Sequence, residues 1–253
     1  MHFLKDNKTV ILGYEKTAER GDINFLDCSE PKISDFYYNK LNGGMGGIGC
    51  FQDGRFVLVA DKKGVFAYVD LAKGPNIDDI KAASVQTAFE GSMDLSLSPN
   101  ETKVAVGMGD NRCMVLDIGK ARGIPTACKE FRRHMYGVNS VNWHPYKSLI
   151  LSSSLDMQDT IKLWDPHSDT LIQDINLHTK ATVIRSQFHP RGHTFFSIGK
   201  DHQVFEHEIR YRGYLHKYRL EHEPSALEVL PNGNVVIGDT NGGLSWYDSR
   251  API

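Results

Sequence analysis

Histidine, serine and aspartate, the three residue types of a hydrolytic centre, occur close together near the middle of the chain. His134 precedes Ser152, with Ser154 as an alternative two residues on, and Asp156 and Trp164 follow. In a serine hydrolase the histidine takes the serine proton and the aspartate orients the histidine. The same residues can also form a buried hydrogen-bonded network, to which the tryptophan contributes its indole N–H. The predicted secondary structure around these residues distinguishes a hydrolytic centre from a buried structural network.

Other chemical motifs in the sequence are weaker. GMGGIG (44–49) matches the G-x-G-x-x-G pattern of dinucleotide sites, which requires a helix after the last glycine. CFQDGR and an apolar run follow instead, so we expect a loop between two β units. There is no paired-carboxylate site, nucleophile elbow, P-loop or HExxH motif. The sequence therefore predicts a protein that is not an enzyme and binds no small-molecule substrate.

Histidines are concentrated near the C-terminal end, at His202, His207, His216 and His222. Successive residues of a strand point to opposite faces, so these side chains are expected on both faces of two strands. A metal site needs them to converge on one point. We therefore expect neither a metal nor another cofactor.

A repeat of about 45 residues organises the whole chain. Five polar turns, marked by Gln52, Pro99, Pro145, Pro190 and Pro231, are separated by 47, 46, 45 and 41 residues. Six apolar strands ending in an acid are separated by 43, 47, 48, 43 and 40 residues; the acids are Asp27, Asp70, Asp117, Asp165, Glu208 and Asp248. Short alternating runs rich in Val, Ile, Phe and Tyr lie between these markers.

A period near 45 with about four short strands per unit is typical of the WD-repeat β-propeller. We predict an all-β, single-domain propeller over residues 1–253, with about six recognisable blades of the seven-bladed type. The first and last units look incomplete, so the ring is expected to be partial or imperfectly closed. Such an end would leave strand edges open to a partner or to aggregation.

This register favours the structural interpretation of the central residues. His134, Ser152, Asp156 and Trp164 fall where WD repeats place a His–Ser–Asp–Trp tetrad. The two His-Pro pieces, around His144 and His189, are expected to end innermost strands and to lie on exposed turns.

Two segments combine basic and aromatic residues. RYRGYLHKYR (210–219) could meet phosphates with its cations and stack its rings on bases. A solvated outer hairpin is the simpler interpretation. KEFRRH (129–134) is the second basic segment and is expected to be a loop between blades. Candidate partner or RNA contacts are Tyr136, Arg185, Arg210, Arg212, Tyr214, Lys217, Arg219 and Arg250, and weaker candidates in turns are Lys62, Lys63, Asn111, Gln158, His202 and Asn241.

The bulk composition fits a globular protein outside the secretory pathway. Of 253 residues, 40% are hydrophobic and 24% charged, and four cysteines are scattered without a C-x-x-C pair. No apolar run is long enough to span a membrane, and no signal peptide is recognisable. A formal net charge of −2 argues against binding nucleic acid by overall charge. We expect a nuclear or cytoplasmic location.

Residues 134–215 resemble the WD-repeat subunit of the eukaryotic pre-mRNA cleavage and polyadenylation specificity factor. The matching pieces are VNSVNWHP (138–145), SLDMQDTIKLWDP (154–166) and KDHQVFEHEIRY (200–211). The resemblance implies a nuclear, non-catalytic scaffold that joins other protein subunits beside the polyadenylation-signal RNA. The basic segment that precedes the propeller in that family has no counterpart here, so the scaffold role is expected rather than direct recognition of the signal.

A substrate receptor of a cullin–RING ubiquitin ligase is the rival hypothesis. Such receptors carry an aromatic-Asp-x-Arg at the end of a third strand, which Tyr247-Asp248-Ser249-Arg250 matches. An Asp-x-Arg there can also be a local ion pair of little energetic value. An adaptor of some other multiprotein complex is the third possibility.

Overall fold

The computed structural model describes residues 44–70, 91–120, 122, 125–158, 160–211 and 213–248, together with the backbone of strands at 2–3, 9–17, 20–27, 32–33, 38–41 and 84–86. Within these residues every regular element is a β-strand, which confirms the all-β prediction. In the same residues there is no helix long and apolar enough to cross a membrane.

Four sheets are antiparallel meanders, in which each strand pairs with the next strand along the chain. Their strands are β6 (Met45–Cys50), β7 (Phe56–Asp61), β8 (Val65–Asp70) and β9 (Ser84–Gln86); β10 (Ser92–Leu97), β11 (Lys103–Met108), β12 (Cys113–Asp117) and β13 (Thr126–Phe131); β14 (Val138–Trp143), β15 (Ile150–Ser154), β16 (Ile161–Asp165) and β17 (Thr170–Ile175); and β18 (Val183–Phe188), β19 (Thr194–Gly199), β20 (Gln203–Glu208) and β21 (His216–Arg219).

Two further sheets lie at the ends of the chain. The last is a three-stranded meander of β22 (Pro224–Val229), β23 (Val235–Asp239) and β24 (Leu244–Tyr247). The first contains β1 (His2–Phe3), β2 (Thr9–Thr17), β3 (Arg20–Asp27), β4 (Lys32–Ile33) and β5 (Tyr38–Leu41). It is not a meander, because β4 and β5 both pair with β3.

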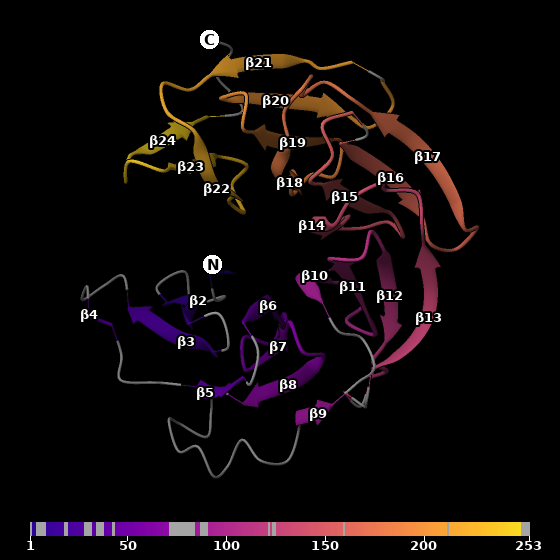
Figure 1. Ribbon diagram of the computed structural model, residues 1–253, viewed down its shortest axis with the longest axis vertical. Helices are drawn as coiled ribbons and strands as arrows, with labels where there is room; N and C mark the ends of the chain where they lie inside the picture. The colour runs from indigo at the N-terminus through magenta and orange to yellow at the C-terminus, as the bar shows by residue number, and fades with distance from the viewer. Residues whose placement is uncertain are drawn as a thin grey trace.

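The sheets are arranged as propeller blades around an arc (Figure 1). The first strand of each meander is innermost, and β6, β10, β14, β18 and β22 contact one another in that order. The structure thus contains five blades, which corrects the prediction of about six blades of the seven-bladed type. The remaining acid-ended strand is β3, which ends at Asp27. It belongs to the first sheet, whose strand pairing differs from that of the blades. In Figure 1 this sheet and β22–β24 stand at the two ends of the arc.

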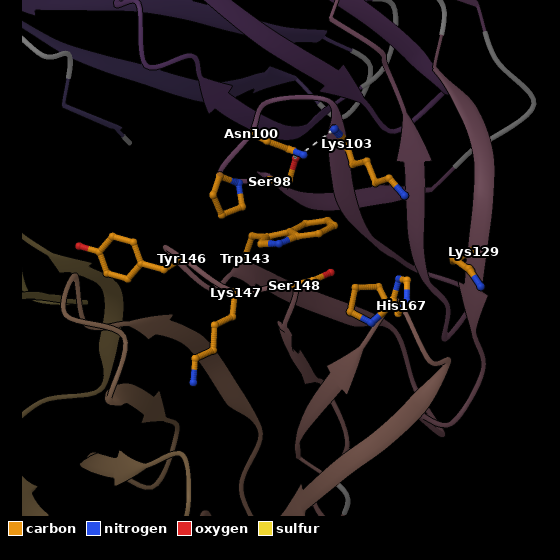
Figure 2. A pocket seen from close by; sticks show the side chains of 11 residues that line it. Ser98, Asn100, Lys103, Lys129, Trp143, Tyr146, Lys147, Ser148 and His167 are labelled. Carbon is orange, nitrogen blue, oxygen red and sulfur yellow. Dashed lines mark hydrogen bonds between the residues drawn. The ribbon is translucent and has the colours of Figure 1, made fainter.

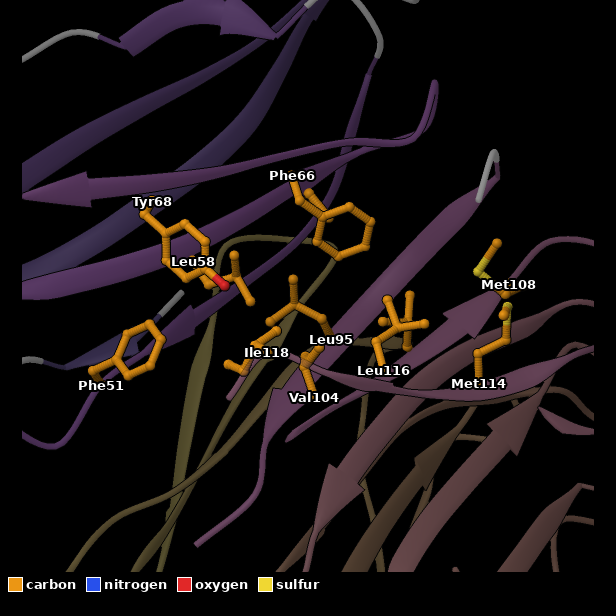
Figure 3. Packing of buried hydrophobic residues seen from close by; sticks show 12 residues of the cluster. Phe51, Leu58, Phe66, Tyr68, Leu95, Val104, Met108, Met114, Leu116 and Ile118 are labelled. Carbon is orange, nitrogen blue, oxygen red and sulfur yellow. The ribbon is translucent and has the colours of Figure 1, made fainter. Parts of the chain in front are cut away.

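The central strands of the three middle blades, β10–β13, β14–β17 and β18–β21, are buried on both faces, because a neighbouring blade packs on either side. In β11 every residue after Lys103 is buried, whereas the outer strand β17 alternates between exposed and covered residues. Figure 3 shows the core between the blades β6–β9 and β10–β13, where Leu58, Phe66 and Leu95 pack among buried Val and Met side chains. Each such side chain contributes about 1.5–3 kcal/mol of hydrophobic stabilisation.

Innermost strands are also joined by side chains at one repeated position. The Oγ atom of Ser96 accepts the Trp143 amide proton at 2.9 Å, and Asn142 Oδ1 accepts that of Phe188 at 2.9 Å. Gln187 Oε1 accepts the Val229 amide proton at 3.1 Å. Each acceptor is the next-to-last residue of its strand, so the repeat itself sets the register between successive blades.

The His-Pro pieces end the innermost strands β14 and β18 as predicted, but their histidines are buried rather than exposed. His144 Nδ1 accepts the amide protons of Tyr146 and Lys147 at 3.0 and 2.9 Å, and its Nε2 lies 2.9 Å from the Gly192 carbonyl oxygen of the next blade. Burial lowers the pKa of His144 and keeps its ring neutral. His189 Nδ1 likewise accepts the Arg191 amide proton at 3.0 Å, so the repeated His-Pro closes a turn in both blades, and the His144 ring also ties two blades.

GMGGIG is not a loop between units. Met45–Cys50 is the strand β6, paired with β7 and packed against β10. A Cβ atom on Gly47 would lie 2.7 Å from the Leu95 amide nitrogen, which only glycine avoids. The glycines therefore allow two backbones to approach, and nothing in this arrangement resembles the helix of a dinucleotide site.

Candidate interaction surface

The structure brings three of the four tetrad residues together. His134 Nε2 lies 2.7 Å from Ser152 Oγ, and the Trp164 indole N–H donates to the same oxygen at 2.7 Å. The Asp156 carboxylate accepts the Gln158 amide proton at 2.9 Å in the turn between β15 and β16. The Ser152 side chain is fully buried beneath two neighbouring strands. A substrate cannot reach this hydroxyl, so the arrangement stabilises the blade and does not form a hydrolytic site.

The next blade contains a related network that the sequence analysis missed. His178 Nδ1 lies 2.9 Å from Asp201 Oδ1, and its Nε2 lies 2.9 Å from Ser197 Oγ. His207 occupies the place of the tryptophan, with Nε2 2.8 Å from the same oxygen. The spacing in the sequence could have revealed this network, because His178, Ser197 and Asp201 follow the histidine, serine and aspartate of the first tetrad by 44 or 45 residues. The network was not recognised because His207 stands at the position where the tetrad has a tryptophan.

An exposed apolar patch lies above the tetrad, on the face formed by the loops that precede first strands and the turns that follow second strands. We call this the top face. Met135, Tyr136, Leu155 and Met157 expose 67%, 59%, 42% and 57% of their surface there. With Asp156 and Gln158 they line a hollow of about 470 Å³. Exposed apolar groups gathered around a hollow are typical of protein interaction sites.

Hydrogen bonds to backbone carbonyl groups hold this patch, which we call the Met135 patch, in place. Asn111 Nδ2 of the preceding blade donates to the Met135 carbonyl oxygen at 2.9 Å, and Ser154 Oγ donates to that of Tyr136 at 3.1 Å. The Leu155 amide donates to the Gly137 carbonyl oxygen at 3.0 Å. The two loops are thus tied to each other and to the preceding blade. The side chains project from a fixed base, which lowers the entropy lost on binding.

The predicted contact residues do not form one site. Tyr136 belongs to the Met135 patch, and the weaker turn candidates all lie in turns between second and third strands. Arg185 lies on the innermost strand β18, with Nη2 4.0 Å from Asp94 Oδ1. Burial raises the pKa of Asp94, and Arg185 opposes that effect. Arg185 therefore lies beside a carboxylate of the innermost strand β10.

The basic and aromatic segment follows β20 and forms the outer strand β21, as the hairpin interpretation predicted (Figure 1). Arg210 and Arg219 are exposed, and Lys217 Nζ lies 5.4 Å from the centre of the Phe205 ring. The Tyr214 ring meets the same phenylalanine edge-on at 5.2 Å. Arg212 and Arg250 lie outside the described residues.

The second basic segment differs from its prediction. In KEFRRH, predicted as a loop, Lys129–Phe131 are the end of strand β13 and only 132–134 form the connection. Among the described residues no group of three or more His, Cys, Asp or Glu side chains could hold a metal ion.

Comparison with known families identifies one repeat directly. Residues 126–165 match the family model described as "WD domain, G-beta repeat", a stretch that runs from β13 to the end of β16. The fold is a β-propeller, and this stretch of it matches a WD repeat. The matched model describes a repeated unit of the propeller.

Solved structures give the same fold. The structure of Sqt1 from Chaetomium thermophilum, bound to the N-terminus of the ribosomal protein L10, superposes with a TM-score of 0.70 and 17% sequence identity. The match covers 91% of the present chain and 65% of the Sqt1 chain, so the present chain spans just under two thirds of that structure's length. At this identity the likeness concerns the fold alone.

Proposed function

We propose that this protein is a non-catalytic scaffold that binds a short apolar segment of a partner protein at the Met135 patch. The single observation that carries the proposal is the exposure of four large apolar side chains around one hollow of the top face. Leaving this surface in water is unfavourable by about 25 cal/mol per Å² of apolar area, which a bound segment would recover.

The chemistry of the patch supports a peptide ligand. Two of its four side chains are methionines, which adapt their shape to irregular partners, and Tyr136 adds a rigid ring that can anchor an interface. Sqt1, which shares the fold, was crystallised with the N-terminus of a ribosomal protein. A terminal or otherwise extended segment is therefore the class of ligand we propose for the present chain.

The complex that we propose is the mRNA 3′-end cleavage and polyadenylation machine in the nucleus. The support is the sequence resemblance of residues 134–215, which include every apolar member of the patch. Exposed Arg210 and Arg219 on the outer side of β20–β21 would allow RNA to pass nearby.

Affinity purification of the intact protein, with and without Met135→Asp and Met157→Asp together, tests the proposal. The double variant is expected to lose partner subunits while its melting temperature changes by less than about 2 °C, because both side chains are exposed. Ile172→Asp, at an exposed position of β17 in the same blade, is the matched control. Retention of all partners by the double variant would exclude the patch as the binding site.

The identity of the co-purifying proteins tests the complex. Endonuclease and zinc-finger subunits support the 3′-end processing role. A cullin adaptor that is lost on Arg250→Ala, and kept by the double variant, would support the ubiquitin-ligase hypothesis instead. A different set of subunits would identify a scaffold of another complex.

A further inference from the structure

A second hollow, of about 490 Å³, lies on the opposite face of the arc between the blades β10–β13 and β14–β17 (Figure 2). The turn after β10, the turn after β14 and the start of the turn after β16 form its walls. In an antiparallel meander these turns lie at the end away from the Met135 patch. We call it the lysine cleft; its lining residues are Ser98, Pro99, Asn100, Lys103, Lys129, Trp143, Tyr146, Lys147, Ser148, Pro166 and His167.

The charge of the cleft is opposite to that of the chain. Lys103, Lys129 and Lys147 line it, and none of its lining residues is acidic, although the formal net charge of the protein is −2. Lys129 Nζ pairs with Asp169 Oδ2 at 2.6 Å, at the outer end of the cleft. Among the described residues, no ion pair within 4.0 Å involves Lys103 or Lys147. A concave surface lined by one sign of charge concentrates its field and attracts oppositely charged ligands.

The floor of the cleft is apolar and closed. The Trp143 indole lies at the centre of the view in Figure 2, and it exposes only 7% of its surface; Pro99 lines the cleft with it. Tyr146 is 73% exposed at the inner end of the cleft. Single-stranded nucleic acid is held by base stacking on several accessible rings. Here the exposed rings are Tyr146 and His167, which stand at opposite sides of the cleft in Figure 2 and form no continuous stacking platform, so the lining favours an anionic chain that does not need one.

We propose that the lysine cleft binds an acidic peptide segment, whose Asp or Glu carboxylates pair with Lys103 and Lys147 while an apolar side chain packs on the Trp143 and Pro99 floor. The lysine ammonium groups are point charges that can pair with carboxylates at variable spacing, whereas the planar arginine guanidinium requires a fixed geometry. The site is independent of the Met135 patch, because the two lie at opposite ends of the same strands.

Fluorescence anisotropy of a labelled hexaglutamate peptide carrying one terminal leucine tests this proposal, with hexaglutamine and octauridylate probes beside it. We expect binding of the glutamate peptide that weakens as salt rises from about 50 to about 300 mM, since the Debye length shortens. Lys103→Gln with Lys147→Gln should weaken it at least about fivefold, equivalent to about 1 kcal/mol. Lys180→Gln, an exposed lysine on the top face, should leave it unchanged.

Each result decides the proposal. Loss of peptide binding in the double lysine variant, with retention in Lys180→Gln and in Met135→Asp, supports it and separates this site from the proposed partner site. Peptide binding that the double lysine variant retains, or no binding at about 50 mM salt, overturns it. Tighter binding of octauridylate than of hexaglutamate would also overturn it, because the ligand class would then be nucleic acid.

Discussion

His207 Nε2 lies 2.8 Å from Ser197 Oγ, where the neighbouring blade places Trp164 Nε1 2.7 Å from Ser152 Oγ. The third strands of the two blades, β16 and β20, thus place different rings beside the equivalent serine hydroxyl. The His207 ring stacks on Phe195 at 4.3 Å with an interplanar angle of 8°, so it also fills space between two strands. His207 can replace tryptophan at this position because its ring both forms a hydrogen bond with Ser197 and stacks on Phe195.

Ser197→Ala is expected to destabilise the protein by about 1–3 kcal/mol, because two buried histidine nitrogens lose their shared partner. Chemical denaturation at pH 7.5 measures the change in the free energy of unfolding. Ser148→Ala, at an exposed turn position, is the control and should change it by less than about 0.5 kcal/mol. Equal effects of the two substitutions would contradict a structural role for the network.

His207 makes stability depend on pH. Burial lowers its pKa from the ordinary value of 6.5 to about 3. The unfolded chain therefore takes up a proton at a higher pH than the folded protein does, and stability is lost as the pH falls from about 7 toward 3. At pH 5.5 the loss from this one group should be about 1.4 kcal/mol.

The variant His207→Phe isolates that contribution. It removes a hydrogen bond at every pH, but the loss of stability between pH 7.5 and 5.5 should be smaller than in the wild type by about 1.4 kcal/mol. Urea denaturation at the two pH values measures both differences. The other buried groups, such as His144 and Asp94, are unchanged and cancel in the comparison. An identical pH dependence in both proteins would show that folding does not lower the pKa of His207.

Much of the fold follows from the sequence, because each blade repeats the same solution to the same packing problem. Two independent markers with a common period predicted the strand pairs, and the Asp at the end of third strands is explained by turn chemistry. Asp165 Oδ1 accepts the His167 amide proton at 2.8 Å, and Asp117 Oδ1 accepts that of Gly119 at 2.8 Å. Blade number was wrong because an Asp-ended strand identifies a strand, not the pairing of the sheet around it.

The interaction surfaces were less predictable, because they depend on residues that meet only across blades. Tyr136 was a candidate, but Met135, Leu155 and Met157 belong to two connections about 20 residues apart and carry no motif. The lysine cleft joins three turns from two blades. His144 was expected on an exposed turn, since the sequence did not show that the next blade would cover it.

Gly47→Ala should weaken packing between β6 and β10. Its Cβ atom would lie 2.7 Å from the Leu95 nitrogen and 2.9 Å from the Asp94 carbonyl carbon, both backbone atoms that cannot rotate away. We expect a loss of about 1–3 kcal/mol in thermal or chemical denaturation. Gly109→Ala is the matched control, since its nearest neighbour would be 3.5 Å away. A stable Gly47→Ala protein would mean that the two innermost strands can separate without cost.

Asn142→Ala tests whether side chains at the repeated position fix one blade to the next. The substitution removes the acceptor of the Phe188 amide proton, which lies 2.9 Å from Asn142 Oδ1 at the end of β18. Since that amide is partly buried, we expect a loss of about 1–2 kcal/mol and a melting temperature lower by about 2–6 °C.

Hydrogen exchange gives the sharper measurement, because the Phe188 amide alone should lose protection beyond the global change. The Val229 amide, held by Gln187 Oε1 at 3.1 Å, is the internal control and should keep its relative protection. Unchanged exchange at Phe188 would mean that apolar packing between the blades sets their register without this hydrogen bond.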